Sequence, residues 1–369
     1  MPDAETMPGK RSLSIIVPTF REAENLPELI DRIERVCDEH GLKAELLIMD
    51  DNSRDGTAEL IATLQKPWVR LVVRTENRGL SAAVLDGFCL AQHDVLVVMD
   101  ADLSHPPEQI PELVAALDAG ADFVIGSRYV AGGSTDEDWG LLRWLNSKAA
   151  TLLARPFTSA KDPMSGFFAL RRETLARAPS LNPVGYKIGL EILVKCGCRA
   201  VREAPIHFSQ RRRGKSKLSL REQMRYLQHL RRLAVYKYGD WAHFVQFAAV
   251  GFSGTVVNLA VLTALVWAHA PLRLSVAVAI LVSMFTNFLL NRWITFSYAR
   301  QGSFWGQMAG FFGASSIGAV VNYGATLGAL WLWPALERVP QIAAVLGILA
   351  GLTFNFFMSR HLVFRKPAD

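Results

Sequence analysis

Four long stretches without any Asp, Glu, Lys or Arg fill the last third of the 369-residue sequence. They lie between Asp240 and Arg273, between Arg273 and Arg292, between Arg300 and Glu337, and between Arg338 and Arg360. A helix that crosses the hydrocarbon core of a bilayer needs about 20 predominantly apolar residues. We therefore expect an integral membrane protein whose chain leaves water near residue 240. A helical bundle buried in water is the alternative, and four such segments in series argue against it.

The expected membrane region, residues 241–369, carries an internal repeat. Its predicted spans are 243–268, 273–296, 306–331 and 340–362. The segment GTVVNLAVL around Asn258 resembles GAVVNYGAT around Asn322, which lies 64 positions later. TNFLLNRWITF around Asn287 likewise resembles FNFFMSRHLVF around Asn355, which lies 68 positions later. The repeat predicts two helical hairpins in tandem, with these asparagines hydrogen-bonded across helices. A more specific alternative is that these asparagines line a path for lipid headgroups through the membrane.

The distribution of positive charge predicts how the spans are oriented. Lys and Arg cluster before the first span, after the second and after the fourth, whereas the two outer loops hold only Arg273 and Arg338. Cytoplasmic loops of membrane proteins carry the excess of Lys and Arg. We therefore expect both termini, and the whole region before residue 240, on the cytoplasmic side of the cell membrane.

The region before residue 240 alternates short apolar runs with segments of helical periodicity. This order predicts an α/β unit with a mostly parallel sheet covered by helices on both faces. In such sheets ligands bind at the carboxyl ends of the strands. Three predicted strands end in polar groups, at residues 19–22, at Asp50-Asp51 and at 100–102. These strand ends therefore form the predicted site.

Asp100 and Asp102 stand one residue apart directly after the apolar run VLVVM. Two carboxylates at the end of a buried strand are costly without a partner. A divalent cation is the simplest partner, and oxygen ligands suit Mg²⁺ or Mn²⁺. A solvated pair that caps the helix beginning near Pro106 is the alternative. The convergence of two other acidic strand ends on the same edge favours the metal.

Five motifs in order carry a family resemblance over about the first 220 residues. They are PTFREAENLPELI, IMDDNSRDGT, MDADLSHPPEQIPEL, VIGSRYVAGG and DPMSGFFALRR. Together they resemble family 2 glycosyltransferases of the GT-A fold. SHPPE after the DAD motif and FSQRRRGKSKLS narrow the resemblance to dolichol- and polyprenol-phosphate mannose synthases. The second half is similar to the GtrA-like four-helix membrane domain. The implied organisation is a GT-A domain at 1–217, amphipathic interfacial helices at 218–240 and the membrane domain at 241–369.

The resemblance implies roles for individual residues. Nucleotide-sugar contacts are implied for Pro18, Phe20, Glu22, Met49, Asp51, Asp100, Ala101, Asp102, Arg128, Arg211 and Lys217. Metal binding is implied for Asp102 and Ser104, although some relatives have a glutamine in place of Ser104. Lipid-phosphate contacts are implied for Arg128, Arg143 and Ser147, and catalytic roles for Asp100, Asp102 and Arg128. The family usually has Tyr-Asn where this chain has Phe20-Arg21, so a hydroxyl contact is lost there.

The implied reaction is transfer of mannose from GDP-mannose to a polyprenyl monophosphate, metal-dependent and with inversion at the anomeric carbon. The acceptor oxygen belongs to a phosphate that is already anionic, so the reaction needs no dedicated general base. The same chemistry with UDP-glucose is one alternative. A membrane flippase with a regulatory glycosyltransferase-like unit is another, and the intact DAD motif argues against it.

A basic run at residues 210–239 precedes the first predicted span, in a chain of net charge +6. Most such runs are solvated faces. No recognised nucleic-acid-binding motif accompanies it, so we expect no nucleic-acid partner. Next to a membrane span, a basic amphipathic stretch is typical of a membrane-surface element. We therefore expect residues 211–217 to form an active-site loop and residues 218–238 to lie along the bilayer surface.

Overall fold

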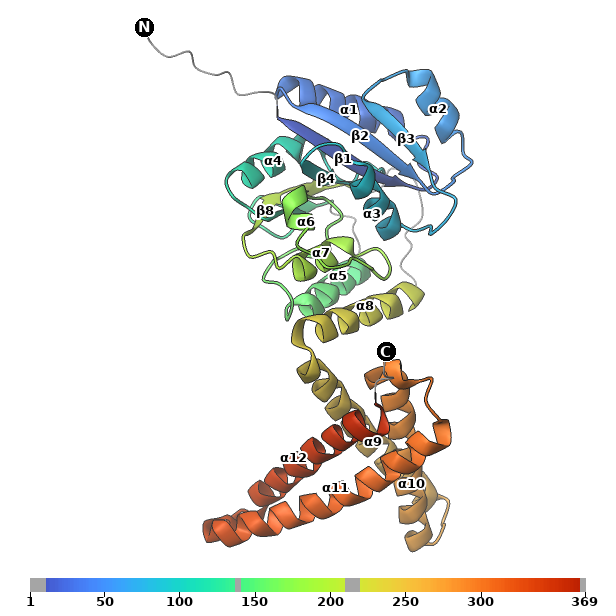
Figure 1. Ribbon diagram of the computed structural model, residues 1–369, viewed down its shortest axis with the longest axis vertical. Helices are drawn as coiled ribbons and strands as arrows, with labels where there is room; N and C mark the ends of the chain where they lie inside the picture. The colour runs from blue at the N-terminus through green and yellow to red at the C-terminus, as the bar shows by residue number, and fades with distance from the viewer. Residues whose placement is uncertain (1–10, 137–140, 210–219, 366–369) are drawn as a thin grey trace. The chain divides into compact units, whose positions relative to one another are not determined.

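The computed structural model describes residues 11–136, 141–209 and 220–365, without the side chains of 141–144 and 220. The chain divides into two compact units between Lys237 and Tyr238. The first unit is the α/β region that the alternating sequence pattern predicts. The second consists of long apolar helices (Figure 1).

A seven-stranded sheet forms the centre of the first unit. Its strands are β1 (Ser12–Thr19), β2 (Lys43–Asp50), β3 (Val69–Val73), β4 (Val95–Val98), β5 (Phe123–Ser127), β7 (Phe168–Arg171) and β8 (Val201–Pro205). Their order is β3-β2-β1-β4-β7-β5-β8. Only β7 runs antiparallel to its two neighbours, so the prediction of a mostly parallel sheet is confirmed. A separate two-stranded sheet pairs β6 (Ser134–Thr135) with β9 (His207–Phe208).

Helices cover both faces of this sheet because successive side chains of a strand point to opposite sides. The helices are α1 (Leu26–Glu39), α2 (Thr57–Leu64), α3 (Leu80–Leu90), α4 (Ile110–Asp118), α6 (Arg172–Leu175) and α7 (Ile188–Lys195). Helix α5 (Leu141–Ala154) belongs to a smaller, separate core. On β1, Ile15 belongs to the core that α1 and α4 cover, whereas its neighbour Ile16 belongs to the core that α3 and α7 cover. Both faces of the sheet are therefore covered by apolar cores, and polar groups gather at the strand ends.

Helix α8 (Leu220–Tyr238) packs on the first unit. Leu230 and Leu233 are buried in a small core with Ala154 and Leu190. Tyr226 donates a hydrogen bond from Oη to the carbonyl oxygen of Ala150 at 2.7 Å. This part of the basic run is thus a structural component of the first unit. Its attachment to a membrane surface stays a prediction.

The described part of the second unit contains four long helices. They are α9 (Asp240–Trp267), α10 (Leu272–Leu290), α11 (Phe304–Leu332) and α12 (Pro340–Met358). Within the described residues, three segments are long and apolar enough to cross a membrane, namely Asp240–Trp267, Leu272–Thr295 and Pro340–Val363. Helix α11 has 29 residues but is not among them. Its six glycines and its Gln, Ser and Asn residues make it less apolar. A fourth span therefore stays a prediction.

Phenylalanines at equivalent repeat positions form the core of the second unit. Phe296 and Phe364, 68 positions apart, stack with ring centroids 5.0 Å apart and planes at 17°. Phe247 contacts Phe356 at 5.8 Å, and the equivalent pair, Phe311 and Phe288, contacts at 5.9 Å. Both hairpins also end in a π-helical turn, at Asn291–Thr295 and Ser359–Val363. The sequence repeat is thus a structural repeat.

The asparagines of the repeat pack against glycines of the neighbouring helix. The amide of Asn287 lies against Gly254, and that of Asn355 against Gly318, so closely that a Cβ atom on either glycine would overlap it. The Oδ1 atoms of Asn287 and Asn355 are buried without a hydrogen-bond partner. The prediction of hydrogen bonds across helices is therefore wrong for these two oxygens. Backbones that approach this closely leave room for the amide but not for a partner placed to bind it.

Candidate active site

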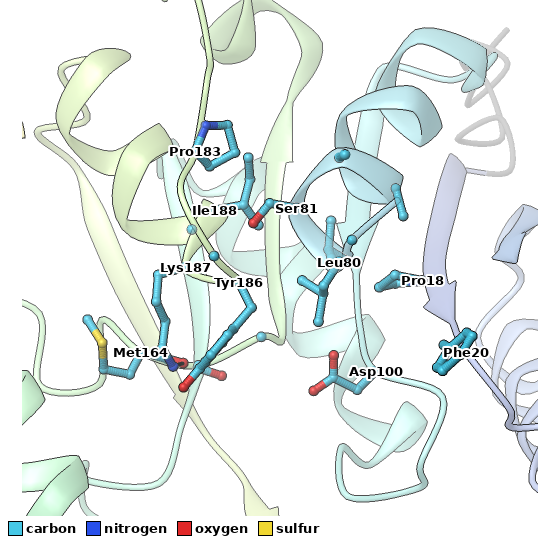
Figure 2. Close-up of a pocket in the computed structure, with 18 of the residues that line it drawn as sticks. Pro18, Phe20, Leu80, Ser81, Asp100, Met164, Pro183, Tyr186, Lys187 and Ile188 are labelled. Carbon is cyan, nitrogen blue, oxygen red and sulfur yellow. Dashed lines mark hydrogen bonds between the residues drawn. The ribbon is translucent and has the colours of Figure 1, made fainter. Parts of the chain in front are cut away.

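A cavity of about 1210 Å³ opens at the carboxyl ends of β1, β4 and β5 (Figure 2). Eight of the residues predicted from the sequence line it: Pro18, Phe20, Glu22, Asp51, Asp100, Ala101, Asp102 and Arg128. The sheet brings them together because parallel strands end at one edge. Three others do not line it, namely Met49, Ser104 and Ser147. Arg211 and Lys217 lie outside the described residues, and so does the side chain of Arg143.

The loop after β1 supplies an aromatic wall of the cavity. The ring of Phe20 has the guanidinium carbons of Arg21 and Arg78 at 5.2 and 5.3 Å from its centroid. Arginine over an aromatic face is attracted by the electrons of the ring. Arg78 also lines the cavity, and sequence reasoning missed it. Its only sequence signal is its place between the third strand and the glycine that begins the next helix.

The end of β2 contributes Asp51 but not the side chain of Met49. Asp51 forms a buried ion pair with Arg74 and accepts a hydrogen bond from the backbone N–H of Gly79 at 2.6 Å. Its carboxylate is thereby fixed at the cavity wall. Met49 is fully buried in the core on the α3 side of the sheet. Contact of Met49 with a nucleotide stays a prediction.

The DAD motif makes a tight turn after β4. The turn places Leu103 at a φ of 60°, a conformation that is rare for a bulky side chain. Ser104 donates to Asp102 Oδ1 from its hydroxyl at 2.5 Å and from its backbone N–H at 3.1 Å. Ser104 is 1% exposed. Ser104 thus holds the Asp102 carboxylate in place, and its own metal contact stays a prediction.

The oxygen donors at this turn suit a hard divalent cation. Among the described residues, no group of three or more His, Cys, Asp or Glu side chains is placed to hold a metal ion. Mg²⁺ commonly binds through one or two carboxylates together with substrate phosphates and water. Asp100 and Asp102 at the cavity match such a donor set. The residues present therefore fit a metal that is held jointly with a diphosphate.

His105 supports the same turn, and sequence reasoning assigned it no role. Its Nδ1 accepts a hydrogen bond from the backbone N–H of Asp100 at 3.1 Å. Its ring stacks on Phe167 at 5.5 Å and meets Phe208 edge-on at 5.4 Å. Burial lowers the pKa of His105 below its usual range. A neutral ring keeps Nδ1 available as the acceptor. His105 belongs to the SHPPE motif, which supported the family resemblance but did not indicate this hydrogen bond.

Arg128 is held by a buried aspartate. Its Nε and Nη2 donate to the two carboxylate oxygens of Asp162, each at 2.7 Å. Asp162 is 0% exposed and also accepts from the backbone N–H of Arg128 at 3.1 Å. Burial acts to lower the pKa of Arg128, but its hydrogen bonds to Asp162 and the negative charge of that residue outweigh burial, and the pKa is raised. Arg128 thus faces the cavity as a permanent cation of fixed orientation.

Ser147, on helix α5, accepts a hydrogen bond from the hydroxyl of Tyr129 at 2.8 Å. The ammonium of Lys148 lies 3.7 Å from the centre of the Tyr129 ring. Tyr129 directly follows Arg128 in the chain, so Ser147 is linked to the neighbourhood of Arg128 through one side chain. Contact of Ser147 with a lipid phosphate stays a prediction.

Lys187 is a further cavity residue that sequence reasoning missed. Its Nζ donates to the carbonyl oxygen of Met164 at 3.2 Å and lies 4.5 Å from the centre of the Tyr186 ring. Burial, together with the nearby positive charge of Arg128, lowers the pKa of Lys187 to about 8. Its sequence signal is weak, because a lysine just before an apolar helix is commonly an exposed residue.

Comparisons with known proteins identify two family domains. Residues 14–177 match the model of glycosyl transferase family 2. Residues 246–364 match that of the GtrA/DPMS transmembrane domain. A solved structure, glucosyl-3-phosphoglycerate synthase from Mycobacterium tuberculosis, is 22% identical, covers 62% of this chain and 80% of its own, and has a TM-score of 0.46. That likeness is too weak to carry an argument about chemistry.

One relative extends the match to both units. The chain is 40% identical over 355 residues to the dolichol-phosphate mannosyltransferase of Pyrococcus furiosus, covering 95% of this chain and 98% of that protein. Over 236 residues it is 43% identical to the dolichol-phosphate mannosyltransferase of Saccharomyces cerevisiae, covering 61% of this chain and 88% of that protein. The chain is therefore a glycosyltransferase that belongs to the dolichol-phosphate mannosyltransferase family, with a family 2 catalytic unit followed by a GtrA/DPMS transmembrane domain.

Proposed function

We propose that this enzyme transfers mannose from GDP-mannose to a polyprenyl monophosphate, with inversion at the anomeric carbon. The observation that carries the proposal is the alignment with the Pyrococcus furiosus dolichol-phosphate mannosyltransferase over both units. A shorter alignment, 38% identical over 229 residues, leads to a polyprenol monophosphomannose synthase of Mycolicibacterium smegmatis. Both names describe mannosyl transfer to a polyprenyl phosphate.

In the proposed reaction, an oxygen of the acceptor phosphate bonds to the anomeric carbon of mannose. The bond from that carbon to the diphosphate breaks, and GDP leaves with both bonding electrons. The attacking oxygen is already anionic near neutral pH, because the second pKa of a phosphate monoester is about 6. The protein thus needs no general base. Its task is to hold two anionic groups close together.

The cavity residues divide this task. Pro18, Phe20 and Asp51 bind the nucleotide at the ends of β1 and β2, and Asp100 and Arg128 line the same cavity. Asp102, held by Ser104, binds Mg²⁺ or Mn²⁺. When bound, the ion supplies positive charge against the leaving diphosphate. Arg211 and Lys217 add positive charge there. Arg128, Arg143 and Ser147 bind the acceptor phosphate, where arginine can form two parallel hydrogen bonds.

The second unit holds the catalytic unit beside its acceptor. A long prenyl chain stays in the bilayer, so anchoring concentrates the phosphate at the active site. The distribution of Lys and Arg supports four spans with both termini and the catalytic unit in the cytoplasm of the cell. Labelling of single cysteines placed in the loops at 268–272 and 333–339, from one side of sealed vesicles, tests this orientation.

A competition assay tests the proposed reaction. The purified protein in detergent receives a polyprenyl phosphate, a divalent metal, and GDP-mannose and UDP-glucose at equal concentration with different labels. We expect label from mannose in the lipid product and release of GDP. Label from glucose would assign the enzyme to UDP-glucose instead. Absence of transfer from either donor would contradict the proposal and favour lipid movement as the role of the membrane unit.

A further inference from the structure

Lys187 lies in the cavity without a role in the reaction described above. It directly precedes α7, and its ammonium group carries three hydrogen-bond donors. Among the described residues Nζ makes one hydrogen bond, to the carbonyl oxygen of Met164 at 3.2 Å. No carboxylate of the described residues forms an ion pair with it. The ammonium therefore keeps donors for a ligand in the cavity that it lines.

The position of Lys187 separates it from the nucleotide residues. Figure 2 shows Pro18 and Phe20 on one side of Asp100, and Lys187, Tyr186 and Met164 on the other. The nucleotide side is formed by the ends of β1 and β2 and by the start of α3. The side of Lys187 is formed by the end of β5 and by the loops before β7 and α7. This second side is left for the acceptor.

On the Lys187 side of the cavity, a bound phosphate monoester requires a second cation besides Arg128. Arg128 already donates from two nitrogens to Asp162, so one negative charge offsets its own. A phosphate monoester carries close to two negative charges near pH 7. The charged and titratable groups that face Lys187 or line the cavity around it are Arg128, Asp162, Asp100, Tyr186, Arg221, Glu222 and Arg225. Lys187 is placed to supply the missing charge.

The loop that carries Lys187 is fixed at several points. The backbone N–H of Asn182 donates to Glu191 Oε1 at 2.7 Å. The backbone N–H of Val184 donates to His229 Nδ1 at 3.3 Å. Glu191 and His229 are both buried. A ligand-binding group on a fixed loop loses little conformational freedom when the ligand arrives.

We infer that Lys187 binds the phosphate of the polyprenyl phosphate acceptor together with Arg128 and directs its attacking oxygen toward the sugar. The inference rests on the proposed function and adds a residue to its acceptor site. The pKa of about 8 agrees with this role, because Lys187 is then protonated while the acceptor phosphate is dianionic, between about pH 6 and 8. A bound dianion would raise the pKa of Lys187 further.

The test compares three variants of the full-length protein in detergent. Lys187→Gln removes the charge, and Lys187→Arg keeps it with a group that does not lose its proton below pH 12. Lys161→Gln removes an exposed lysine beside Asp162 and serves as the matched control. We expect Lys187→Gln to raise the KM for polyprenyl phosphate on the order of 10- to 100-fold, as loss of a hydrogen bond to a charged group predicts. The KM for GDP-mannose should hardly change.

Two further measurements distinguish a lysine that binds the acceptor phosphate from a lysine that only supports the fold. Lys187→Arg should restore much of the affinity for the lipid. It should also remove the fall in kcat/KM above about pH 8 that we expect of the wild-type enzyme. Lys161→Gln should match the wild type in both constants.

Four outcomes would overturn the inference. A rise confined to the KM for GDP-mannose would assign Lys187 to the donor. A lower melting temperature with both KM values unchanged would make it structural. Loss of turnover in Lys187→Arg at unchanged lipid affinity would make it a proton acceptor. An unchanged Lys187→Gln enzyme would remove Lys187 from the site and leave the proposed function standing. If the wild-type protein transfers no sugar to the lipid phosphate, the proposed function itself fails.

Discussion

Arg128 and Asp162 form a two-pronged ion pair in which Nε and Nη2 of the arginine donate to the two carboxylate oxygens, each at 2.7 Å. Asp162 is completely buried, so its charge depends on this partner. Replacing it leaves a buried guanidinium without its counter-charge. The pair thus links the stability of the catalytic unit to the orientation of its principal cavity cation.

Asp162→Asn should lower the free energy of unfolding by about 3–5 kcal/mol, the usual cost of breaking a buried ion pair. It should also raise the KM for the lipid phosphate, because Arg128 loses its fixed orientation. Thermal melting and steady-state kinetics measure the two effects. Glu108→Gln, which breaks the exposed pair with Arg32, is the control and should cost at most about 1 kcal/mol. Equal losses in the two variants would contradict the prediction.

Asp102→Asn should leave the melting temperature of the protein nearly unchanged and almost abolish turnover. A neutral amide is a poorer ligand for the cation that offsets the leaving diphosphate. Chelation of divalent metal from the wild-type enzyme should stop the reaction, and added Mg²⁺ or Mn²⁺ should restore it. Near-normal turnover of the variant at saturating Mn²⁺ would show that Asp102 is not the metal ligand.

His105→Phe should lower kcat while keeping the aromatic packing against Phe167 and Phe208. The variant leaves the backbone N–H of Asp100 without its acceptor, which costs about 1–3 kcal/mol and loosens the turn that carries both aspartates. His105→Asn offers an oxygen near the position of Nδ1 and should restore part of kcat. A smaller loss in His105→Phe than in His105→Asn would exclude the hydrogen bond as the cause.

Burial lowers the pKa of His229, with the neighbouring Glu191 opposing the shift. A histidine that is harder to protonate when folded adds stability above its unfolded pKa of about 6.5, and this stability is lost as the pH falls. The melting temperature should therefore decrease below pH 6.5, and His229→Gln should flatten that part of the profile. A His229→Gln profile as steep as that of the wild type would contradict the assignment.

Gly254→Ala and Gly318→Ala should each destabilise the membrane unit by about 1–3 kcal/mol, because the new Cβ overlaps the amide of Asn287 or Asn355. The matched controls are Gly251→Ala and Gly313→Ala on the same helices, where a Cβ meets nothing within 4 Å. Thermal unfolding in detergent measures the difference. If all four variants melt alike, the close contacts between these glycines and asparagines do not hold the hairpins together.

The sequence by itself predicted the features that depend on local order. Apolar runs that alternate with segments of helical periodicity predicted a mostly parallel sheet. A helix between two strands carries the chain back, so that the next strand runs in the same direction as the one before. Acidic residues at strand ends predicted the cavity edge at Asp51, Asp100 and Asp102. Uncharged stretches predicted the helical second unit, and the 64- and 68-residue spacings predicted its repeat. These features were predictable because each can be recognised within one short segment or by comparing two segments of the sequence.

The tertiary structure decided the features that depend on where a side chain points and on what distant residue meets it. Asp162 lies 34 positions after Arg128, and nothing in either motif states that they pair. Lys187 reaches the cavity although Asp100 lies far earlier in the chain. Met49, two residues before Asp51, points into the core rather than into the cavity. Asn287 packs against Gly254 instead of forming a hydrogen bond. Packing of elements that are remote in sequence decides these contacts, because a side chain's partners are set by the elements folded against it.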